Sequence, residues 1–259
     1  INGVQSEGVG ACIKHFAFNN QETARLGNDV RIDQRAAREL YLRNFEIAIK
    51  KSHPWAVMSS YNRVNGTETS ERRDLLTTIL RDEWGFGGIV MTDWLGGTDP
   101  IWRDGATDRV ANMTAGNDLI EPGATVDVQT IEKAVKSGKL NIKYLNENVK
   151  RILQMIVKTP RFKDYKYTNK PDLNAHAQIT RNSAAEGTVL LENKGALPFA
   201  SNVKNIALYG VGSYDPIPGG TGSGNVNSSY TVSIVEGLRN NNYQVDNRIL
   251  NTYNSYVKP

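Results

Sequence analysis

Short apolar runs alternate with helical patterns along residues 1–158. Four runs have the length of a buried strand, at residues 9–13, 55–58, 89–91 and 118–120. Strands that alternate with helices every ~30 residues are typical of βαβ units and a parallel sheet. A closed (β/α)8 barrel needs eight such units. The four units therefore predict the C-terminal half of a barrel.

The intervening segments carry apolar residues at helical spacing. The first helix is expected to begin at Asp33, which can cap it, and to end before Pro54. Its predicted apolar face consists of Ala37, Leu40, Tyr41, Phe45, Ala48 and Ile49. A second helix, capped by Ser70, is expected to bury Leu75, Leu76, Ile79 and Leu80. Two further helices are predicted at residues 128–137 and 142–157, after the last strand.

The alternation breaks at residues 159–173. This segment holds two prolines, three aromatics and three lysines, which favours an interdomain linker. Residues 174–259 are expected to form a second domain of α/β type. Its predicted elements are a helix near 175–186, strands at 188–191 and 205–209, a glycine-rich loop at 219–224, a helix at 233–240 and a last helix that reaches the end of the chain.

The run at residues 89–91 is followed by the strongest candidate for chemistry. Gly85 can end the preceding helix, and Asp93 and Trp94 come directly after the strand. In a (β/α)8 barrel the carboxyl ends of the strands carry the active site. A carboxylate there is suited to act as a nucleophile, and an indole offers a flat face to a sugar ring. The alternative is that Asp93 only caps the next turn. Asp118, in the next predicted strand, is expected to be a structural residue.

Other strand ends add polar side chains. Lys14 and His15 can donate hydrogen bonds to ligand hydroxyls, or be a solvated Lys beside a satisfied His. Tyr61 can hydrogen-bond a carboxylate or simply pack. Arg25 can bind sugar hydroxyls, compensate the charge of a carboxylate or form a surface ion pair. Met58 is more often a core residue than a ligand contact.

Composition excludes several classes of protein. The chain has 259 residues, and its single cysteine, Cys12, rules out an intrachain disulfide and a thiolate metal cluster. The net charge of +4 is spread along the chain, which argues against nucleic-acid binding. No apolar run approaches the ~20 residues that span a membrane. The chain begins at Ile1 without a signal-peptide pattern, which leaves export open, although we favour a secreted or periplasmic location.

The glycine-rich loop at 219–224 resembles a phosphate cradle only superficially. It lacks the Lys-Ser/Thr pair of a nucleoside-triphosphate loop and does not open directly into a helix. We expect instead a loop that closes over a site, with Ser223 touching the ligand. A nucleotide-binding α/β protein remains an alternative that rests on this loop alone.

The motifs in their order resemble glycoside hydrolase family 3, and in particular its β-glucosidase branch. The matching segments cover residues 14–16, 19–23, 57–62, 90–94, 115–119, 184–193 and 219–224. The resemblance implies a (β/α)8 barrel followed by an α/β sandwich, with the site between them. It also implies hydrolysis of β-linked glucosides with retention of configuration. The chain would hold the C-terminal half of the barrel and the start of the sandwich.

The resemblance also assigns roles to particular residues. Asp93 matches the nucleophile, and Ser223 matches a contact from the sandwich domain to the sugar pocket. The residues that match the lining of that pocket are Lys14, His15, Arg25, Met58, Tyr61 and Trp94. No metal or organic cofactor is implied. Residues 17–30 hold no His, so the N-acetylglucosaminidase branch, which uses a His there, is set aside.

Two parts of the family pattern have no counterpart in this chain. The first barrel strands, with an Asp and an Arg that grip the sugar, are missing, and the general-acid Glu lies beyond residue 259. We therefore expect a complementary polypeptide to supply the rest of the barrel, the sandwich and the acid. The expected substrate is a β-glucoside or oligosaccharide. β-Xylosidase or mixed specificity, or a catalytically silent sugar-binding relative, are the alternatives.

Overall fold

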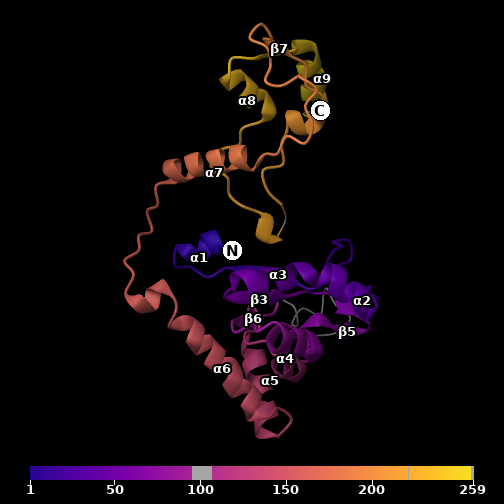
Figure 1. The fold of residues 1–259 in the computed structure, drawn as a ribbon, viewed down its shortest axis with the longest axis vertical. Coiled ribbons are helices and arrows are strands. Elements are labelled where there is room, and N and C mark those ends of the chain that lie inside the picture. The colour runs from indigo at the N-terminus through magenta and orange to yellow at the C-terminus, as the bar shows by residue number, and fades with distance from the viewer. Residues whose placement is uncertain (95–106, 221, 258–259) are drawn as a thin grey trace. The chain divides into compact units, whose positions relative to one another are not determined.

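The computed structural model describes residues 1–94, 107–220 and 222–257 (Figure 1). The chain divides into two compact units, Ile1–Asn169 and Lys170–Pro259. The division falls within the segment 159–173 that the sequence predicts as a linker. The predicted domain limits at residues 158 and 174 remain predictions.

The first unit is built on a parallel sheet. Its strands are β1 (Cys12–Phe16), β3 (Ala56–Ser59) and β6 (Ile89–Met91), which pair in that order. A parallel bridge between Met91 and Leu119 adds the fourth predicted run beside β6. The four runs thus lie side by side in chain order, as the βαβ pattern predicts. Their carboxyl ends meet at one edge of the sheet.

The strands of this sheet differ in how far they are buried. All four residues of β3 are buried, as a continuous apolar run predicts for a central strand. The prediction of a buried strand at residues 9–13 is wrong in position and in burial. β1 begins at Cys12, includes Lys14 and His15, and exposes alternate residues. The described sheet gives β1 a single neighbour, β3, so one edge of this strand faces away from the sheet.

The first predicted helix is interrupted by a π-helical turn. Asp33 caps it as expected, since its carboxylate accepts the N–H of Ala36 at 2.9 Å. The helix consists of α2 (Gln34–Ala36), the π-helical η1 (Ala37–Tyr41) and α3 (Arg43–Ser52). A π turn holds one residue more than an α turn and so rotates the face. Leu40 is therefore 68% exposed, contrary to prediction, and Leu42 is buried instead.

The second predicted helix is π-helical along its length. It forms η3 (Asp74–Glu83) and buries Leu75, Leu76 and Leu80, as expected. Ser70 does not cap it, and that prediction is wrong. Ser70 lies buried in the 3-10 turn η2 (Thr69–Glu71), where its carbonyl accepts the Asn117 side-chain amide at 2.6 Å. The helix itself begins after Arg73.

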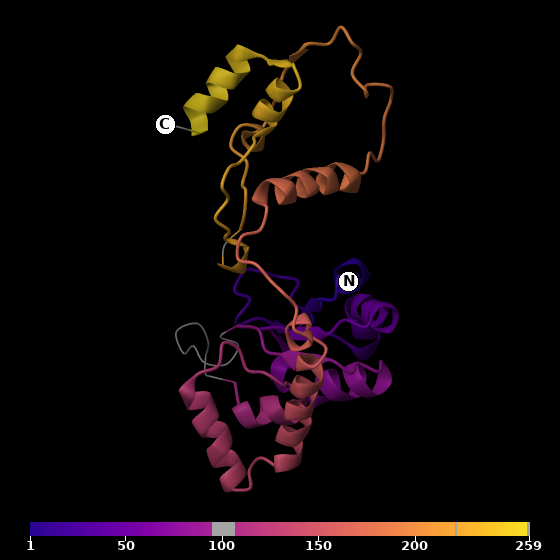
Figure 2. The same cartoon turned by 90° about the vertical axis from the view of Figure 1, so that its left-hand side faces the viewer.

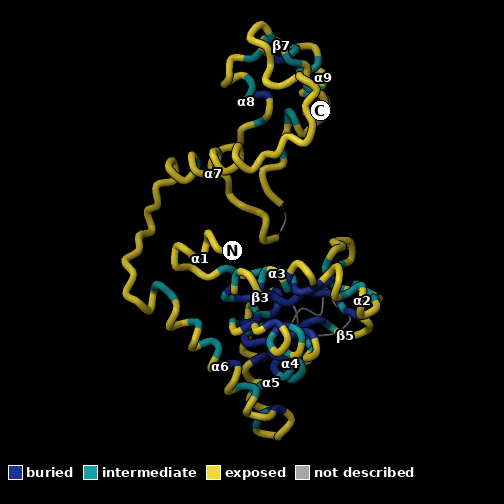
Figure 3. Tube along the Cα trace, in the orientation of Figure 1, coloured by how far each residue is buried: buried dark blue, intermediate teal, exposed yellow. Residues whose placement is uncertain are grey.

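The core of the first unit lies between β3, β6 and these two helices (Figure 3). Phe16 at the end of β1 packs edge-on against Phe45, at 5.0 Å between ring centroids, and against Trp84, at 5.9 Å. A second small sheet, β2 (Asp29–Val30), β4 (Arg63–Val64) and β5 (Thr67–Glu68), was not predicted. Its strands belong to the segments that follow β1 and β3.

Truncation of leucines on opposite faces tests which face of these helices is buried. We expect Leu80→Ala to lower the free energy of unfolding of the first unit by about 2–5 kcal/mol, because Leu80 is fully buried. Leu40→Ala, on the rotated face, is the matched control and should change it by less than about 0.5 kcal/mol. Urea denaturation followed by fluorescence measures both. Equal effects would contradict the register that the π turn imposes.

The remaining helices of this unit follow the sheet. They are α4 (Arg109–Ala115), α5 (Thr125–Lys136) and α6 (Ile142–Ile156), preceded by the short N-terminal α1 (Asn2–Ser6) and followed by the 3-10 turn η4 (Pro160–Lys163). α5 begins three residues before the predicted start, because the Asp127 carboxylate accepts the N–H of Ala124 at 2.9 Å. α6 agrees with its prediction to within one residue. α5 and α6 both pack against α4 and are joined by the turn at residues 137–141 (Figure 2).

The second unit contains the predicted helices but few strands. Its elements are α7 (Leu173–Gly187), β7 (Asn205–Ile206), η5 (Val211–Ser213), η6 (Gly222–Gly224), α8 (Ile234–Asn240), β8 (Gln244–Val245) and α9 (Asn247–Val257). β7 pairs in parallel with β8. The strand predicted at 188–191 is wrong, since this segment is irregular, and the strand predicted at 205–209 has only two residues. Leu191 is 93% exposed and has no neighbouring strand among the described residues.

Candidate active site

The predicted site residues of the first unit gather at the carboxyl ends of the strands. His15 comes from β1, Tyr61 follows β3, and Asp93 follows β6. The Nε2 atom of His15 lies 3.4 Å from Oδ2 of Asp93. Parallel strands end at the same edge of a sheet, and this explains how residues 78 positions apart in sequence become neighbours.

The Asp93 carboxylate is held by its own chain. Its Oδ1 atom accepts the N–H of Trp94 at 2.7 Å, and the residue is 8% exposed. The indole of Trp94 is 56% exposed beside it. The hydroxyl of Tyr61 donates to the carbonyl oxygen of Trp94. Tyr61 therefore fixes the backbone next to the carboxylate, and a hydrogen bond from Tyr61 to the carboxylate itself remains a prediction.

Two cations lie close to His15. Burial lowers the pKa of the His15 imidazole below its usual value, and Lys14 and Arg25 act in the same direction while Asp93 opposes them. The imidazole is therefore neutral at neutral pH and can donate from one ring nitrogen. Arg25 lies against the ring of Tyr61, with 5.1 Å between Cζ and the ring centroid, and pairs with Glu22 at 2.9 Å.

The other predicted residues have different surroundings. Lys14 is exposed on β1, next to His15. Met58 is buried within β3 and pairs with Met91 across the sheet, which agrees with a core position near the site. Ser223 lies in η6 of the second unit and is exposed. Thr221, in the same glycine-rich loop, lies outside the described residues. The role of Ser223 remains a prediction.

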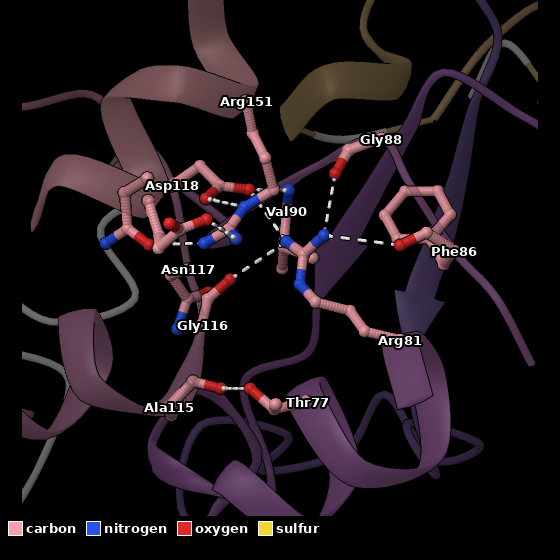
Figure 4. Close-up of polar contacts among 12 residues, drawn as sticks. Thr77, Arg81, Phe86, Gly88, Val90, Ala115, Gly116, Asn117, Asp118 and Arg151 are labelled. Atoms are coloured by element: carbon pink, nitrogen blue, oxygen red, sulfur yellow. Dashed lines mark hydrogen bonds and ion pairs between the residues drawn. The ribbon is translucent and has the colours of Figure 1, made fainter. Parts of the chain in front are cut away.

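Asp118 lies in a buried polar cluster with Arg81 and Arg151 (Figure 4). Its side chain is fully buried and pairs with Arg81 at 2.8 Å and with Arg151 at 2.7 Å. This agrees with the structural role expected for Asp118. The sequence gives no signal for the two arginines, because each lies on the polar side of a helical pattern.

The sequence also does not predict a second buried ion pair, between Arg109 and Asp127. Arg109 donates to the Asp127 carboxylate, and both side chains are less than a tenth exposed. Across the described part of the chain, no three His, Cys, Asp or Glu side chains are grouped so that they could hold a metal ion. None of the described helices is long and apolar enough to cross a membrane.

Family profiles match both parts of the chain. The profile described as "Glycosyl hydrolase family 3 N terminal domain" covers residues 1–155, and the corresponding C-terminal domain covers residues 188–253. The chain belongs to glycosyl hydrolase family 3. The resemblance to this family that the sequence motifs indicate is thereby confirmed.

Relatives within family 3 include several β-glucosidases. The chain is 40% identical to thermostable beta-glucosidase B of Acetivibrio thermocellus, over 92% of this chain and 30% of that protein. It is 41% identical to a beta-glucosidase of Rhizobium radiobacter, over 92% of this chain and 29% of that protein. It is also 36% identical to an exo-alpha-(1->6)-L-arabinopyranosidase of Bifidobacterium longum, over 95% of this chain and 32% of that protein. The chain thus spans about a third or less of the length of these relatives.

Solved structures of family 3 enzymes share the fold. Beta-glucosidase 3B from Thermotoga neapolitana, in complex with glucose, is 47% identical and superposes with a TM-score of 0.85, over 100% of this chain and 36% of that one. This likeness confirms the fold class, the C-terminal half of a (β/α)8 barrel followed by the start of an α/β sandwich.

Proposed function

We propose that this chain is the part of a retaining, exo-acting β-glucosidase that carries the nucleophile, Asp93. The observation that carries the proposal is the Asp93 carboxylate at the end of β6, 3.4 Å from the neutral imidazole of His15. The β-glucosidases among the family 3 relatives support glucose as the sugar.

The reaction would proceed in two displacements. Asp93 attacks the anomeric carbon of a terminal β-D-glucosyl residue and forms a covalent glycosyl-enzyme, while a general acid protonates the leaving oxygen. Water then attacks the same carbon and releases glucose with its configuration retained. We assign the acid to the complementary polypeptide. The proposal requires no metal or organic cofactor.

The neighbouring side chains would bind the sugar in this scheme. His15, Lys14 and Arg25 donate hydrogen bonds to its hydroxyls, which strengthen as charge develops in the transition state. The exposed indole of Trp94 stacks on the apolar face of the ring. We assign smaller contacts to Met58 and Tyr61 in the pocket and to Ser223 in the second unit.

Covalent trapping tests the assignment. A 2-deoxy-2-fluoro glucoside, incubated with the full-length polypeptide that contains this chain, should form a stable ester on Asp93 that peptide mapping locates. The electronegative fluorine destabilises the oxocarbenium-like transition states of both displacements and also removes the 2-hydroxyl contact. A good leaving group keeps the first displacement fast enough for the intermediate to accumulate. A label on Glu121 or Asp118, or no label on any residue, would contradict the proposal.

A second specificity is favoured by two other relatives. One is the arabinopyranosidase of Bifidobacterium longum. The other is an exo-beta-xylosidase of known structure, 25% identical with a TM-score of 0.68. The names of both proteins refer to pentose sugars. The alternative is therefore a β-xylosidase or an enzyme of mixed specificity. The ratio of kcat/KM values for aryl β-glucoside, β-xyloside and α-L-arabinopyranoside distinguishes these candidates. A catalytically silent sugar-binding relative would bind glucose and turn over none of the three.

A further inference from the structure

Asp118 supplies an acceptor that the backbone of a longer strand would otherwise supply. In a parallel sheet, the N–H and C=O of one residue bond to the same neighbouring strand. The C=O of Val90 accepts the N–H groups of Asp118 at 2.7 Å and Leu119 at 3.2 Å. The N–H of Val90 donates instead to Oδ2 of the Asp118 carboxylate, at 2.7 Å. The side chain therefore replaces a carbonyl at the start of this short fourth strand.

The same carboxylate oxygen is fixed from the side of η3. Arg81 donates to Oδ2 of Asp118 at 2.8 Å and also to the carbonyl oxygens of Gly88, at 2.8 Å, and Gly116, at 3.2 Å (Figure 4). Gly88 directly precedes β6, and Gly116 precedes the fourth strand. Burial lowers the pKa of Arg81 to about 10, so the guanidinium stays charged at neutral pH. Arg81 thus ties the beginnings of both strands to one helix.

The second carboxylate oxygen is fixed from α6. Nε of Arg151 donates to Oδ1 of Asp118 at 2.7 Å, and Nη2 of Arg151 donates to the Asn148 side chain at 2.6 Å. Asn148 in turn reaches the carbonyl of Met113 in α4, at 3.4 Å. The carboxylate thus receives donors from β6, η3 and α6, and none of its surface is exposed.

These contacts act on β6 and on Thr92, which directly precede Asp93. Val90 lies three residues before Asp93, and Thr92 lies directly before it. Thr92 bonds to the fourth strand twice, since its N–H donates to the carbonyl of Leu119 at 3.0 Å and its hydroxyl accepts the N–H of Glu121 at 2.9 Å. The segment 90–92 is therefore anchored to residues 118–121 at both of its ends.

We propose that Asp118 is a positioning residue for Asp93. With its two arginine partners it fixes the carboxyl end of β6 and hence the direction in which the Asp93 carboxylate points. The inference rests on the proposed function of Asp93 as nucleophile. A nucleophile must be aligned with the anomeric carbon before it attacks, and a displacement of about 1 Å can cost about 10²-fold in rate.

The test compares variants in the full-length polypeptide. In Asp118→Asn, at least one of the three donors must face an NH₂ group, so the end of β6 shifts. We expect the rate at which a 2-deoxy-2-fluoro glucoside labels Asp93 to fall by about 10²-fold, with little change in the inhibition constant of glucose. Arg151→Lys, which keeps the charge and one donor, should slow labelling less than Arg151→Met. These two variants keep the inference testable if Asp118→Asn does not fold.

Asp127→Asn is the matched control. Asp127 is an equally buried carboxylate paired with an arginine, but it contacts α4 and α5 rather than β6. It should lower the melting temperature as Asp118→Asn does and leave the labelling rate within about twofold. If both variants slow labelling equally, or if Asp118→Asn lowers only the melting temperature, the positioning role is overturned. An unsubstituted protein that takes no label on Asp93 overturns the proposed function, and this inference with it.

Discussion

Asp93→Asn should lower kcat/KM for an aryl β-glucoside by about 10⁴-fold in the full-length polypeptide, equivalent to ~5.4 kcal/mol of transition-state stabilisation. The asparagine amide has nearly the size of the carboxylate and its oxygen can still accept the N–H of Trp94. It cannot, however, form the glycosyl ester. The loss should therefore appear in kcat, with a melting temperature close to that of the unsubstituted protein.

The control for this substitution is Asp82→Asn, which neutralises an exposed carboxylate on η3. It should leave kcat/KM unchanged. Asp93→Gly adds a positive test, because azide can enter the vacated space and attack the same carbon. Its product would be the α-glycosyl azide, since a single displacement inverts the configuration. Retention of more than a tenth of the activity by Asp93→Asn would contradict the role of Asp93.

The second large effect is expected when residues 1–259 are produced alone. Among the described residues of the second unit, only Val235 and Val245 are buried, while Leu191 and Ile217 are at least 90% exposed. Burial of one such side chain contributes about 1.5–3 kcal/mol, whereas ordering one residue costs about 1–2 kcal/mol of backbone entropy. Two buried valines cannot order about 90 residues. We expect the second unit to be unfolded in this preparation.

Amide hydrogen exchange measures this directly. Residues of β3 and β6 should be protected, while amides after residue 170 should exchange at the rate of an unstructured peptide. Cellobiose should not be hydrolysed, because its leaving group requires the acid that we assign to the complementary polypeptide. A compact monomer that melts cooperatively and hydrolyses cellobiose would contradict both the burial argument and the placement of the acid.

The sequence predicts much of the first unit because its elements satisfy local rules. Ile89–Met91 is a strand with the predicted bounds, since a continuous apolar run between Gly88 and a polar segment has few other solutions. α6 has nearly its predicted length, and Asp33 caps the helix that follows it. The meeting of His15 with Asp93 also follows from the pattern, because strand ends converge in a parallel sheet.

The remaining features depend on contacts that no local pattern contains. The guanidinium of Arg81 donates to four acceptors outside its own helix, whereas its helical position alone predicts a solvated side chain. Ser70 has the residue type of a helix cap but bonds to Asn117 through its carbonyl. Residues 188–191 have the composition of a strand and lack a neighbouring strand to pair with among the described residues.

The π-helical turn at Ala37–Tyr41 contains one residue more than an α-helical turn at the same place would need. Its hydrogen-bonded rings each enclose one residue more than those of an α-helix. Deletion of one residue here would convert the turn to α-helical geometry. Phe45 and Ile49 lie after the turn, so they would keep their places in the core. The same loss within β3 would exchange the two faces of a buried strand. When family sequences of different lengths are aligned, a single-residue gap in this region therefore belongs at residues 37–41.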